Sequence, residues 1–339
     1  MSELRRTMPI GEQMNEPRRT WVLLLCSLAL FSAGALFASQ ALAQQAEARK
    51  DLVLNGDAKC TRCHDAEDNP QILEIGKTKH GVRGDGRTPT CTSCHGESET
   101  HINKPANATE RPKPERTFTK KSTTPVEERN EACLSCHKGT ARTHWDGSAH
   151  QNNQVACSDC HQMHAPVDRV LQKKTQTQVC FACHKEQRAD SYKISTHPIQ
   201  TGKVVCSDRH NPHGSTGPSM VKKNTINETC HVCHAEKRGP FLFEHQPVVE
   251  NCANCHTPHG SNLSPLLITR APWLCQSCHD GQHSSENPVG RNAASNQAGF
   301  KGTTAGFGAP SNQAAGRACL NCHSVIHGSN SPNGGYFQR

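Results

Sequence analysis

The apolar residues of this 339-residue chain gather in one run near the N-terminus, and the remainder is polar. The run extends from Trp21 to Phe37, and no second hydrophobic stretch follows it. Later segments hold many Gly, Pro, Asn and Thr residues, which predicts short α-helices and irregular loops with little or no β-sheet. Apolar residues make up 33% of the chain, below the roughly 45–50% of ordinary globular domains. So few apolar side chains cannot offset the conformational entropy of folding, and without a cofactor the chain would be largely disordered.

The apolar run has the features of an export signal. Arg18 and Arg19 precede it, and Ala41-Leu42-Ala43 follows it as a small-residue cleavage site. Residues 1–43 are therefore interpreted as a signal peptide, with an uncleaved anchor as the alternative, although the run is short for a membrane span. The mature chain is expected to be soluble by itself in the periplasm.

A five-residue motif, Cys-Xaa-Xaa-Cys-His, occurs nine times in the chain, and a tenth copy, Cys206-Ser-Asp-Arg209-His210, lacks the second cysteine. The motif is the attachment signature of c-type haem, in which two thiols bond to the porphyrin and the adjacent histidine binds the iron. The cysteines of the ten motifs are Cys60, Cys63, Cys91, Cys94, Cys133, Cys136, Cys157, Cys160, Cys180, Cys183, Cys206, Cys230, Cys233, Cys252, Cys255, Cys275, Cys278, Cys319 and Cys322. The proximal histidines, which end the motifs, are His64, His95, His137, His161, His184, His210, His234, His256, His279 and His323.

Zinc knuckles and disulfide frameworks also use closely spaced cysteines. A zinc site needs two such cysteine pairs for each metal and no histidine fixed after them, and disulfides have no relation to histidine. The constant histidine therefore favours haem c, with nine to ten groups covalently attached.

Ten further histidines recur at fixed places between the motifs and are the candidate distal ligands, one for each iron. They are His80, His101, His150, His164, His197, His213, His245, His259, His283 and His327. Of the 22 histidines of the chain, this leaves His144 and His231, and His144 could replace His150. The match of ten to ten predicts that most irons have two histidine ligands, while the sequence leaves open which distal histidine serves which iron.

The motifs alternate between two types, and the second type usually carries an extra histidine three residues later, as in His161-Gln-Met-His164. This alternation predicts five dihaem modules along an elongated file of haems. The third module holds the degenerate site at 206–210. The modules are assigned to residues 44–132, 133–179, 180–229, 230–274 and 275–339.

Two insertions interrupt the first and last modules. Residues 103–130 are rich in Pro, Lys, Glu and Thr, and residues 284–318 in Gly, Ala, Asn and Ser. Both are expected to be solvated linkers, with partner-contacting segments as the alternative.

The formal net charge of +8 does not indicate a nucleic-acid partner. Ten haems would add about twenty propionate carboxylates, which would bring the mature protein to about −13 with ferrous irons and about −3 with ferric irons. The Lys and Arg residues are therefore expected to lie near propionates.

The signal peptide, the length, the alternating motifs and the endings Pro258-His259-Gly260-Ser261 and Ile326-His327-Gly328-Ser329 resemble those of a known family. The family comprises the periplasmic decahaem cytochromes of porin-cytochrome conduits, of the DmsE/MtrA type. The resemblance implies an outer-membrane β-barrel porin as partner, together with periplasmic and extracellular redox proteins. It also implies electron transfer between periplasmic carriers and the cell exterior, in either direction.

An iron with two protein ligands has no open position for a substrate, so the sequence favours an electron carrier over an enzyme. Two alternatives stay open, namely a multihaem reductase with one open haem and a soluble periplasmic cytochrome that stores electrons. Arg209 bears on the first, because reductases often have an unusual attachment motif. Since Cys206, His210 and His213 are all retained, we expect a haem held through Cys206 alone. Alternatively, Arg209 is a variant of a two-cysteine site that arose by a single base change.

Overall fold

The computed structural model describes residues 52–279, 319–321, 323–332 and 337. The signal peptide, the insertion at 284–318, His283 and Cys322 lie outside these described residues. The chain divides into two compact units, which are treated separately below.

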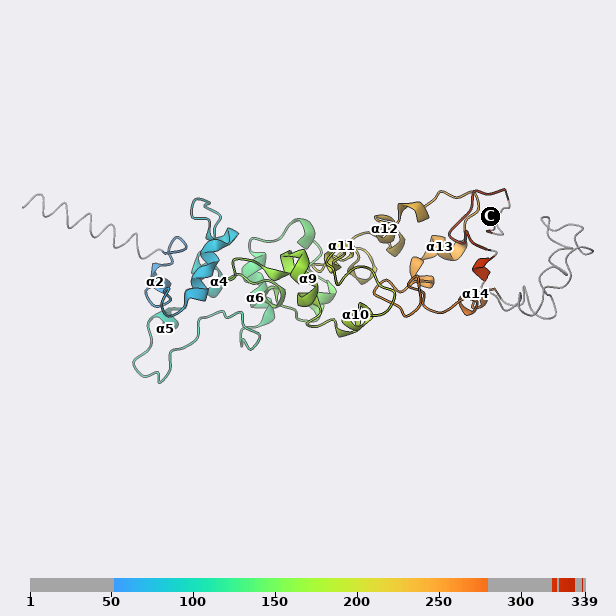
Figure 1. Cartoon of the computed structure of the whole chain (residues 1–339). Helices are drawn as coiled ribbons and strands as arrows, with labels where there is room; N and C mark the ends of the chain where they lie inside the picture. Colours follow the sequence, from blue (N-terminus) through green and yellow to red (C-terminus); the bar gives the residue numbers. More distant parts are fainter. Residues whose placement is uncertain (1–51, 280–318, 322, 333–336, 338–339) are drawn as a thin grey trace, which may run out of the picture. The chain divides into compact units, whose positions relative to one another are not determined.

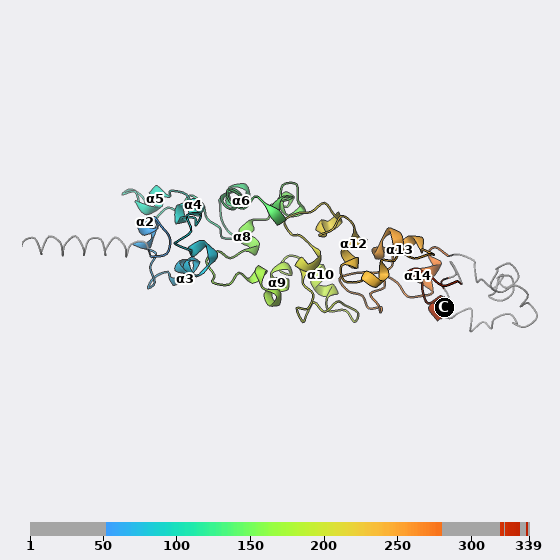
Figure 2. The same ribbon diagram turned by 90° about the horizontal axis from the view of Figure 1, so that it is seen from above.

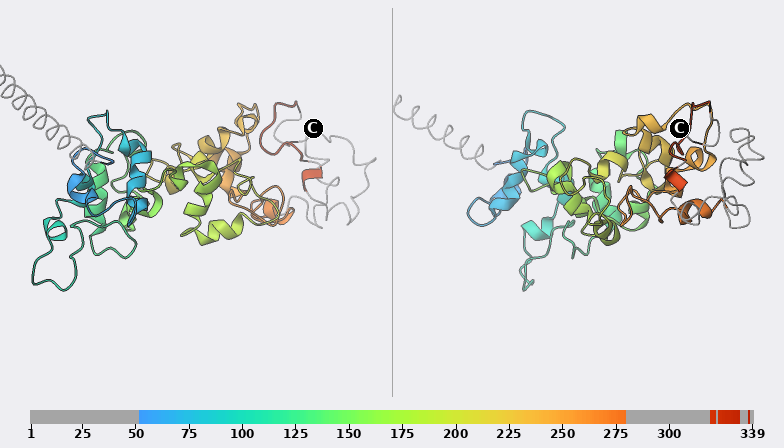
Figure 3. Two further views of the ribbon diagram at one scale, coloured as in Figure 1. Left: turned by 60° about the vertical axis from the view of Figure 1, so that its left-hand side comes forward. Right: turned by 45° about the vertical axis from the view of Figure 1, so that its right-hand side comes forward.

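The first unit comprises the described residues up to Glu115 together with His164–Pro166. Its elements are very short because turn-forming residues recur every few positions. They are α2 (Ala58–Thr61), α3 (Pro70–Leu73), η1 (Glu74–Lys77), η2 (Lys79–Gly81), α4 (Cys91–His95) and α5 (Glu99–Ile102). The segment after α5 continues as a long loop without helical turns (Figure 3).

The second unit comprises Arg116–Met163 and the described residues from Val167 onward. Its longest helix, α6, has nine residues. The elements are α6 (Val126–Leu134), η3 (Thr140–Arg142), α7 (Ala149–Asn152), α8 (Cys157–Cys160), η4 (Arg169–Leu171), α9 (Lys173–Cys180), α10 (Lys185–Asp190), α11 (Cys206–Arg209), η5 (Pro218–Met220), α12 (Ile226–His231), η6 (Ala235–Lys237), α13 (Gln246–Glu250), η7 (Cys252–Asn254), α14 (Trp273–Gln276) and η10 (Cys319–Asn321). Within this unit, α12 and α13 lie side by side in both Figure 1 and Figure 2, and Asn227 of α12 donates to the Val248 carbonyl of α13 over 2.8 Å.

The described residues form no β-strand and contain only isolated bridges between extended residues. These bridges join Ser195 to Ser261, His210 to Val221, Phe243 to Ser329 and His256 to Leu267. The prediction of short helices and irregular loops with little or no sheet is therefore confirmed for this part of the chain. None of the described helices has the length and apolar character needed to cross a membrane.

The protein core is thin in both units. In the first unit the buried apolar side chains are Val53 and Leu54. In the second unit they are Trp145, Ala156, Phe181, Val205 and Val221. Such a small core cannot hold the described residues together by hydrophobic burial alone, as the composition predicts for a chain that folds around cofactors.

Candidate haem sites

Each of the ten motifs contains helical residues in the part of it that the structure describes, and the two types predicted from the sequence differ in where the helix lies. In motifs of the second type, the helix begins at the first cysteine, as in α4, α8, α11, η7 and η10. In the five motifs of the first type, the helix begins before the first cysteine and ends inside the motif, as in α2, α6, α9, α12 and α14. Helical backbone is suited to the motif because it brings the two cysteines and the histidine toward neighbouring positions on one turn.

Side-chain amides join the two motifs of a module. Asn130 of α6 accepts a hydrogen bond from the N–H of Cys157 over 2.8 Å and donates to the Val155 carbonyl over 3.1 Å. Asn227 of α12 accepts in the same way from the N–H of Cys252 over 2.7 Å. Each amide therefore pairs a half-buried N–H at the start of the second motif helix and fixes this helix against the first one.

The first cysteines of the two motifs in each module lie within hydrogen-bonding reach of each other. The five pairs are Cys60 with Cys91, Cys133 with Cys157, Cys180 with Cys206, Cys230 with Cys252, and Cys275 with Cys319. No disulfide joins the described cysteines. Nor do three or more His, Cys, Asp or Glu side chains of the described residues form a group that could hold a metal ion.

Eight proximal histidines face a candidate distal histidine, with ring centres 6.0–6.3 Å apart. Two imidazoles that bind one metal ion from opposite sides, each through a bond of about 2 Å, hold their ring centres roughly 6 Å apart. The residues present therefore fit a haem iron between each pair. The pairs, with the proximal histidine first, are His64–His101, His95–His164, His161–His213, His184–His150, His210–His259, His234–His197, His256–His327 and His279–His245.

Seven of the eight pairs join histidines of different modules, which the sequence left open. The proximal histidine of a second-type motif faces the last histidine of the next module, as in His161 with His213. The proximal histidine of a first-type motif faces the middle histidine of the preceding module, as in His184 with His150. The exception, His64 with His101, lies within the first module. The proximal histidines outside these eight pairs are His137 and His323, and the distal candidates outside them are His80 and His283.

Backbone contacts hold consecutive modules in register. His197 Nδ1 lies 3.0 Å from the carbonyl oxygen of Pro258, the residue before His259, and His150 Nδ1 lies 2.7 Å from that of Pro212, the residue before His213. The Ser195–Ser261 bridge supports the first of these contacts with two hydrogen bonds of 2.8 and 2.9 Å.

A glycine follows the distal histidine in these contacts for a steric reason. Gly260 has a φ of +153°, and a Cβ at this position would collide with the backbone carbonyl of Asp190. Gly328 has a φ of +136°, and its Cβ would collide with the ring of Phe241. A glycine is therefore required after these two histidines, where a carbonyl or an aromatic ring of the preceding module approaches closely.

The first insertion, residues 103–130, contacts a histidine of its own module. The carbonyl oxygen of Pro112 lies 2.7 Å from His101 Nδ1, and Arg111 donates to the His101 carbonyl. The N–H of Ser98 donates to Glu115 Oε1 over 3.1 Å, next to α5. Residues 111–115 thus contact a candidate distal ligand, and a solvated linker over the insertion as a whole stays a prediction.

Known proteins share these motifs over most of the chain. The profile of the cytochrome c-type protein NrfB-like family matches residues 91–175, and the profile of the doubled CXXCH motif matches residues 197–239 and 245–284. The multiheme cytochrome MtrA of Shewanella baltica is 44% identical over 290 residues, which cover 84% of this chain and 81% of that protein. The chain belongs to the MtrA family of multihaem cytochromes. The cytochrome c-type protein NrfB of Haemophilus influenzae is 29% identical over 148 residues, covering 38% of this chain and 65% of that protein.

Membership of the MtrA family confirms two predictions from the sequence. The chain is a multihaem c-type cytochrome that binds haem covalently, and its function is electron transfer. The number of haems and the ligands of each iron are taken up under the proposed function.

Burial keeps several ring pairs of this MtrA-family chain in the form that binds iron. It lowers the pKa of His64, His197, His210 and His259, and it lowers the pKa of His213 to about 4. These rings are therefore neutral near pH 7, and only a neutral imidazole has a nitrogen lone pair for a metal.

Arg209 lies among the ligands of two neighbouring sites. Burial lowers its pKa from the usual range, while the nearby Cys230 and Cys233 act in the opposite direction. Its positive charge in turn lowers the pKa values of His197 and His259, which face His234 and His210 respectively. The guanidinium is thus a cation that acts on rings of both the His210 and the His234 sites.

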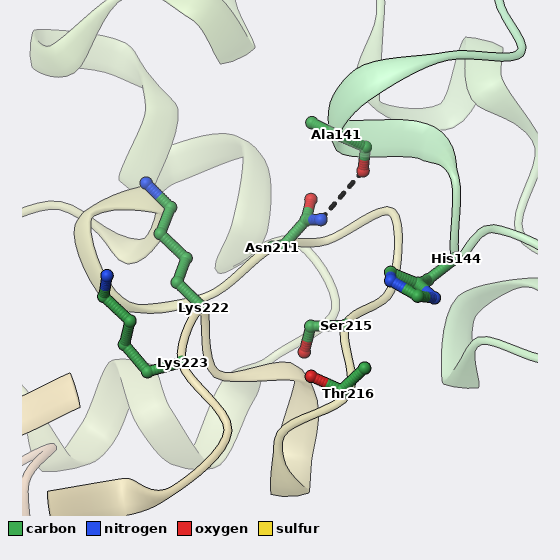
Figure 4. A pocket seen from close by; sticks show the side chains of 7 residues that line it. All are labelled: Ala141, His144, Asn211, Ser215, Thr216, Lys222 and Lys223. Atoms are coloured by element: carbon green, nitrogen blue, oxygen red, sulfur yellow. Dashed lines mark hydrogen bonds between the residues drawn. The ribbon is translucent and has the colours of Figure 1, made fainter. Parts of the chain in front are cut away.

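The two histidines without an assigned slot have different surroundings. His231 is the last residue of α12. His144 lines a polar cavity of about 400 Å³ beside the loop that carries His213, together with Asn211, Ser215, Thr216 and the two lysines Lys222 and Lys223. Figure 4 shows both lysine amines on the same side of the cavity and Asn211 bonded to the Ala141 carbonyl, at 2.8 Å.

Sequence reasoning missed the residues that orient the ligands. Asn130 and Asn227 stand three residues before Cys133 and Cys230, and this repeated spacing is a signal that could have found them. Asp168 contacts His161, but it follows no repeat in the sequence.

Proposed function

We propose that the protein binds ten haems c, with each iron held between a proximal and a distal histidine. The observation that carries the proposal is the set of eight imidazole pairs at 6.0–6.3 Å. Outside these eight pairs, the sequence supplies two more proximal and two more distal candidates. A bound haem would supply reversible one-electron chemistry at its iron.

The residues of this chain restrict that chemistry to electron transfer. The two histidines of a pair would both bind the haem iron, so a small substrate would find no open position there. Backbone carbonyls such as those of Pro212 and Pro258 hold the distal rings, which opposes the loss of a ligand. The protein is therefore an electron carrier rather than an enzyme.

The sixth site, at Cys206, is included in this proposal. The helix α11 has the same length and start as α8, and the rings of His210 and His259 lie 6.1 Å apart. A haem there would be attached through Cys206 alone. The two facing imidazoles also argue against an open, reductase-like site at the irregular motif.

Electron paramagnetic resonance of the oxidised, haem-loaded chain tests the ligation. We expect low-spin signals and no stoichiometric high-spin haem. A high-spin haem that rapidly binds cyanide or nitrite would contradict the proposal and favour the reductase alternative.

We further propose that the chain works in the periplasm and at the outer membrane, together with a β-barrel porin. This proposal is supported by the resemblance to the conduit family and by the 44% identity to MtrA. The chain would then pass electrons between periplasmic carriers and redox partners outside the cell, with the direction set by those partners.

Fractionation and reconstitution test the location and the conduit. The protein is expected in the outer-membrane fraction when the porin is present and in the periplasm when it is absent. Liposomes that carry chain and porin should couple an external reductant to an enclosed dye. Recovery in the periplasm under both conditions would instead support an electron-storage cytochrome.

A further inference from the structure

The His161 ring has a different kind of hydrogen-bond partner from six other histidines of the described chain. Its Nδ1 lies 2.6 Å from Oδ2 of Asp168. The other six bond to backbone carbonyls through Nδ1, namely His101, His150, His164, His197, His210 and His256. A carboxylate carries a full negative charge and a carbonyl only a dipole, so the bond to Asp168 is the stronger one.

The Asp168 side chain is fixed in place. It stands at the start of η4, where Oδ1 accepts hydrogen bonds from the N–H groups of Val170 over 3.3 Å and Gln162 over 3.4 Å. Oδ2 is left to face the ring. Only 12% of the Asp168 side chain and 27% of the His161 side chain are exposed, so water competes little for this contact.

His234 and Glu236 form a second histidine–carboxylate pair, which lies at the surface and serves for comparison. His234 Nδ1 and Glu236 Oε1 are 3.7 Å apart, and their side chains are 55% and 61% exposed. That distance is too long for a hydrogen bond.

The loop after His161 also differs from its two counterparts. Asp168 follows His161 by seven residues. In the other two sites, the carbonyls of Ser219 and Pro265 follow His210 and His256 by nine residues. The shorter loop places a side chain where the longer loops place a backbone carbonyl.

We propose that Asp168 is a positioning residue that makes His161 a stronger electron donor and lowers the reduction potential of the fourth site. The inference rests on the proposed function, in which His161 and His213 bind one haem iron. With its Nδ1 proton donated to Asp168, His161 presents an unprotonated Nε2 for the metal. The negative charge behind the ring raises the basicity of that nitrogen, and a stronger donor favours ferric over ferrous iron.

The test compares Asp168→Asn with the unchanged haem-loaded chain. Asparagine keeps the shape and an acceptor oxygen but removes the charge. We expect one haem to shift to a higher potential by at least a tenfold change in its ferric-to-ferrous ratio, equivalent to about 59 mV for one electron. The paramagnetic resonance spectrum should show a change in one low-spin signal. Asp168→Glu retains the charge and should restore most of the original potential.

Asp159→Asn is the matched control within the same site. Asp159 is an exposed residue of α8, and its carboxylate accepts from the Ala156 N–H over 2.9 Å instead of from a ligand ring. The Asp159→Asn variant removes the same charge without touching His161, so the ferric-to-ferrous ratio of the haem should change by less than tenfold.

The outcomes separate this inference from the proposed function. Intact mass and the low-spin signals show whether all haems are present and have two ligands, and a missing or high-spin haem at this site in the unchanged chain overturns the proposed function. If all haems are present and low-spin, an equal shift in the Asp168→Asn and Asp159→Asn variants overturns the role of Asp168. No shift in either variant also overturns it.

Discussion

The fourth and sixth haem sites start from almost the same sequence and differ in where each carries its charge. Cys157-Ser-Asp-Cys160-His161 and Cys206-Ser-Asp-Arg209-His210 differ in one residue. Both begin a four-residue helix, and in both the aspartate accepts a hydrogen bond of 2.9 Å from the N–H before the first cysteine. Local sequence therefore sets the same motif conformation twice.

The charges around these two matching helices have opposite signs. The ring of His161 donates to the carboxylate of Asp168, while the ring of His210 lies 3.0 Å from the Ser219 carbonyl. The sixth site instead has the cation of Arg209 in the place of the second cysteine. A negative charge favours ferric iron and a positive charge favours ferrous iron, so we expect the fourth site to have the lower potential of the two.

The largest expected difference is in haem attachment. Cys206→Ser removes the single thiol of the sixth site, and we expect the intact mass to fall by one haem. Cys157→Ser is the matched variant, and it should keep ten haems because Cys160 remains. If both variants lose one haem, the fourth site needs both of its thiols although the sixth site holds its haem through one. If the unchanged chain already carries only nine haems, with Cys206 open to alkylation, the sixth site is empty.

The second prediction concerns the distal ligands. His213→Ala and His259→Ala should each produce one high-spin haem, because each ring faces a single proximal histidine, His161 or His210. The haem opened by His213→Ala should be the one whose potential responds to Asp168. His144→Ala is the control and should leave all spectra unchanged, since His144 lines the polar cavity. If neither His213→Ala nor His259→Ala produces a high-spin haem, the pairing is contradicted.

A third prediction isolates the cation of the sixth site. Arg209→Ser removes the charge without adding a thiol, and it should lower the potential of one or two haems by an energy on the order of 1 kcal/mol. Arg209→Cys should lower the reduction potential by a similar amount. Its new thiol should resist alkylation, because that thiol bonds to the haem. Redox titration of the two variants separates charge from attachment. An unchanged potential in Arg209→Ser would mean that solvent screens the guanidinium.

The sequence was sufficient for those features that depend on local chemistry. The ten motifs, their helical conformation and the alternation of two site types follow from residue spacing, and the structure has helical backbone at each motif. The distal candidates could be counted because they recur in register with the motifs. Eight of the ten face a proximal ring in the described residues.

The pairing could not be read from the sequence because it depends on how consecutive modules pack. His259 faces His210, which lies 49 positions away in the preceding module, and the spacing alone allows closer partners. The contact of Pro112 with His101 was missed for a similar reason, because a Pro- and Lys-rich composition predicts solvation whether or not the segment packs on a helix. The boundaries of the five dihaem modules stay a prediction.

The smallest expected effect concerns the aspartates that begin the two helices, and here the sites should behave alike. Asp159→Ala and Asp208→Ala each remove one hydrogen bond of 2.9 Å to a backbone N–H. The free energy of unfolding should fall by about 1 kcal/mol in each case. Thermal unfolding of the haem-loaded variants measures it, and wild-type haem content shows that attachment is intact. A much larger loss for Asp208→Ala than for Asp159→Ala would mean that the single-thiol site relies on its helix more than the fourth site does. If both variants lose the same free energy of unfolding, the two helices contribute equally, and the two sites differ in their charges.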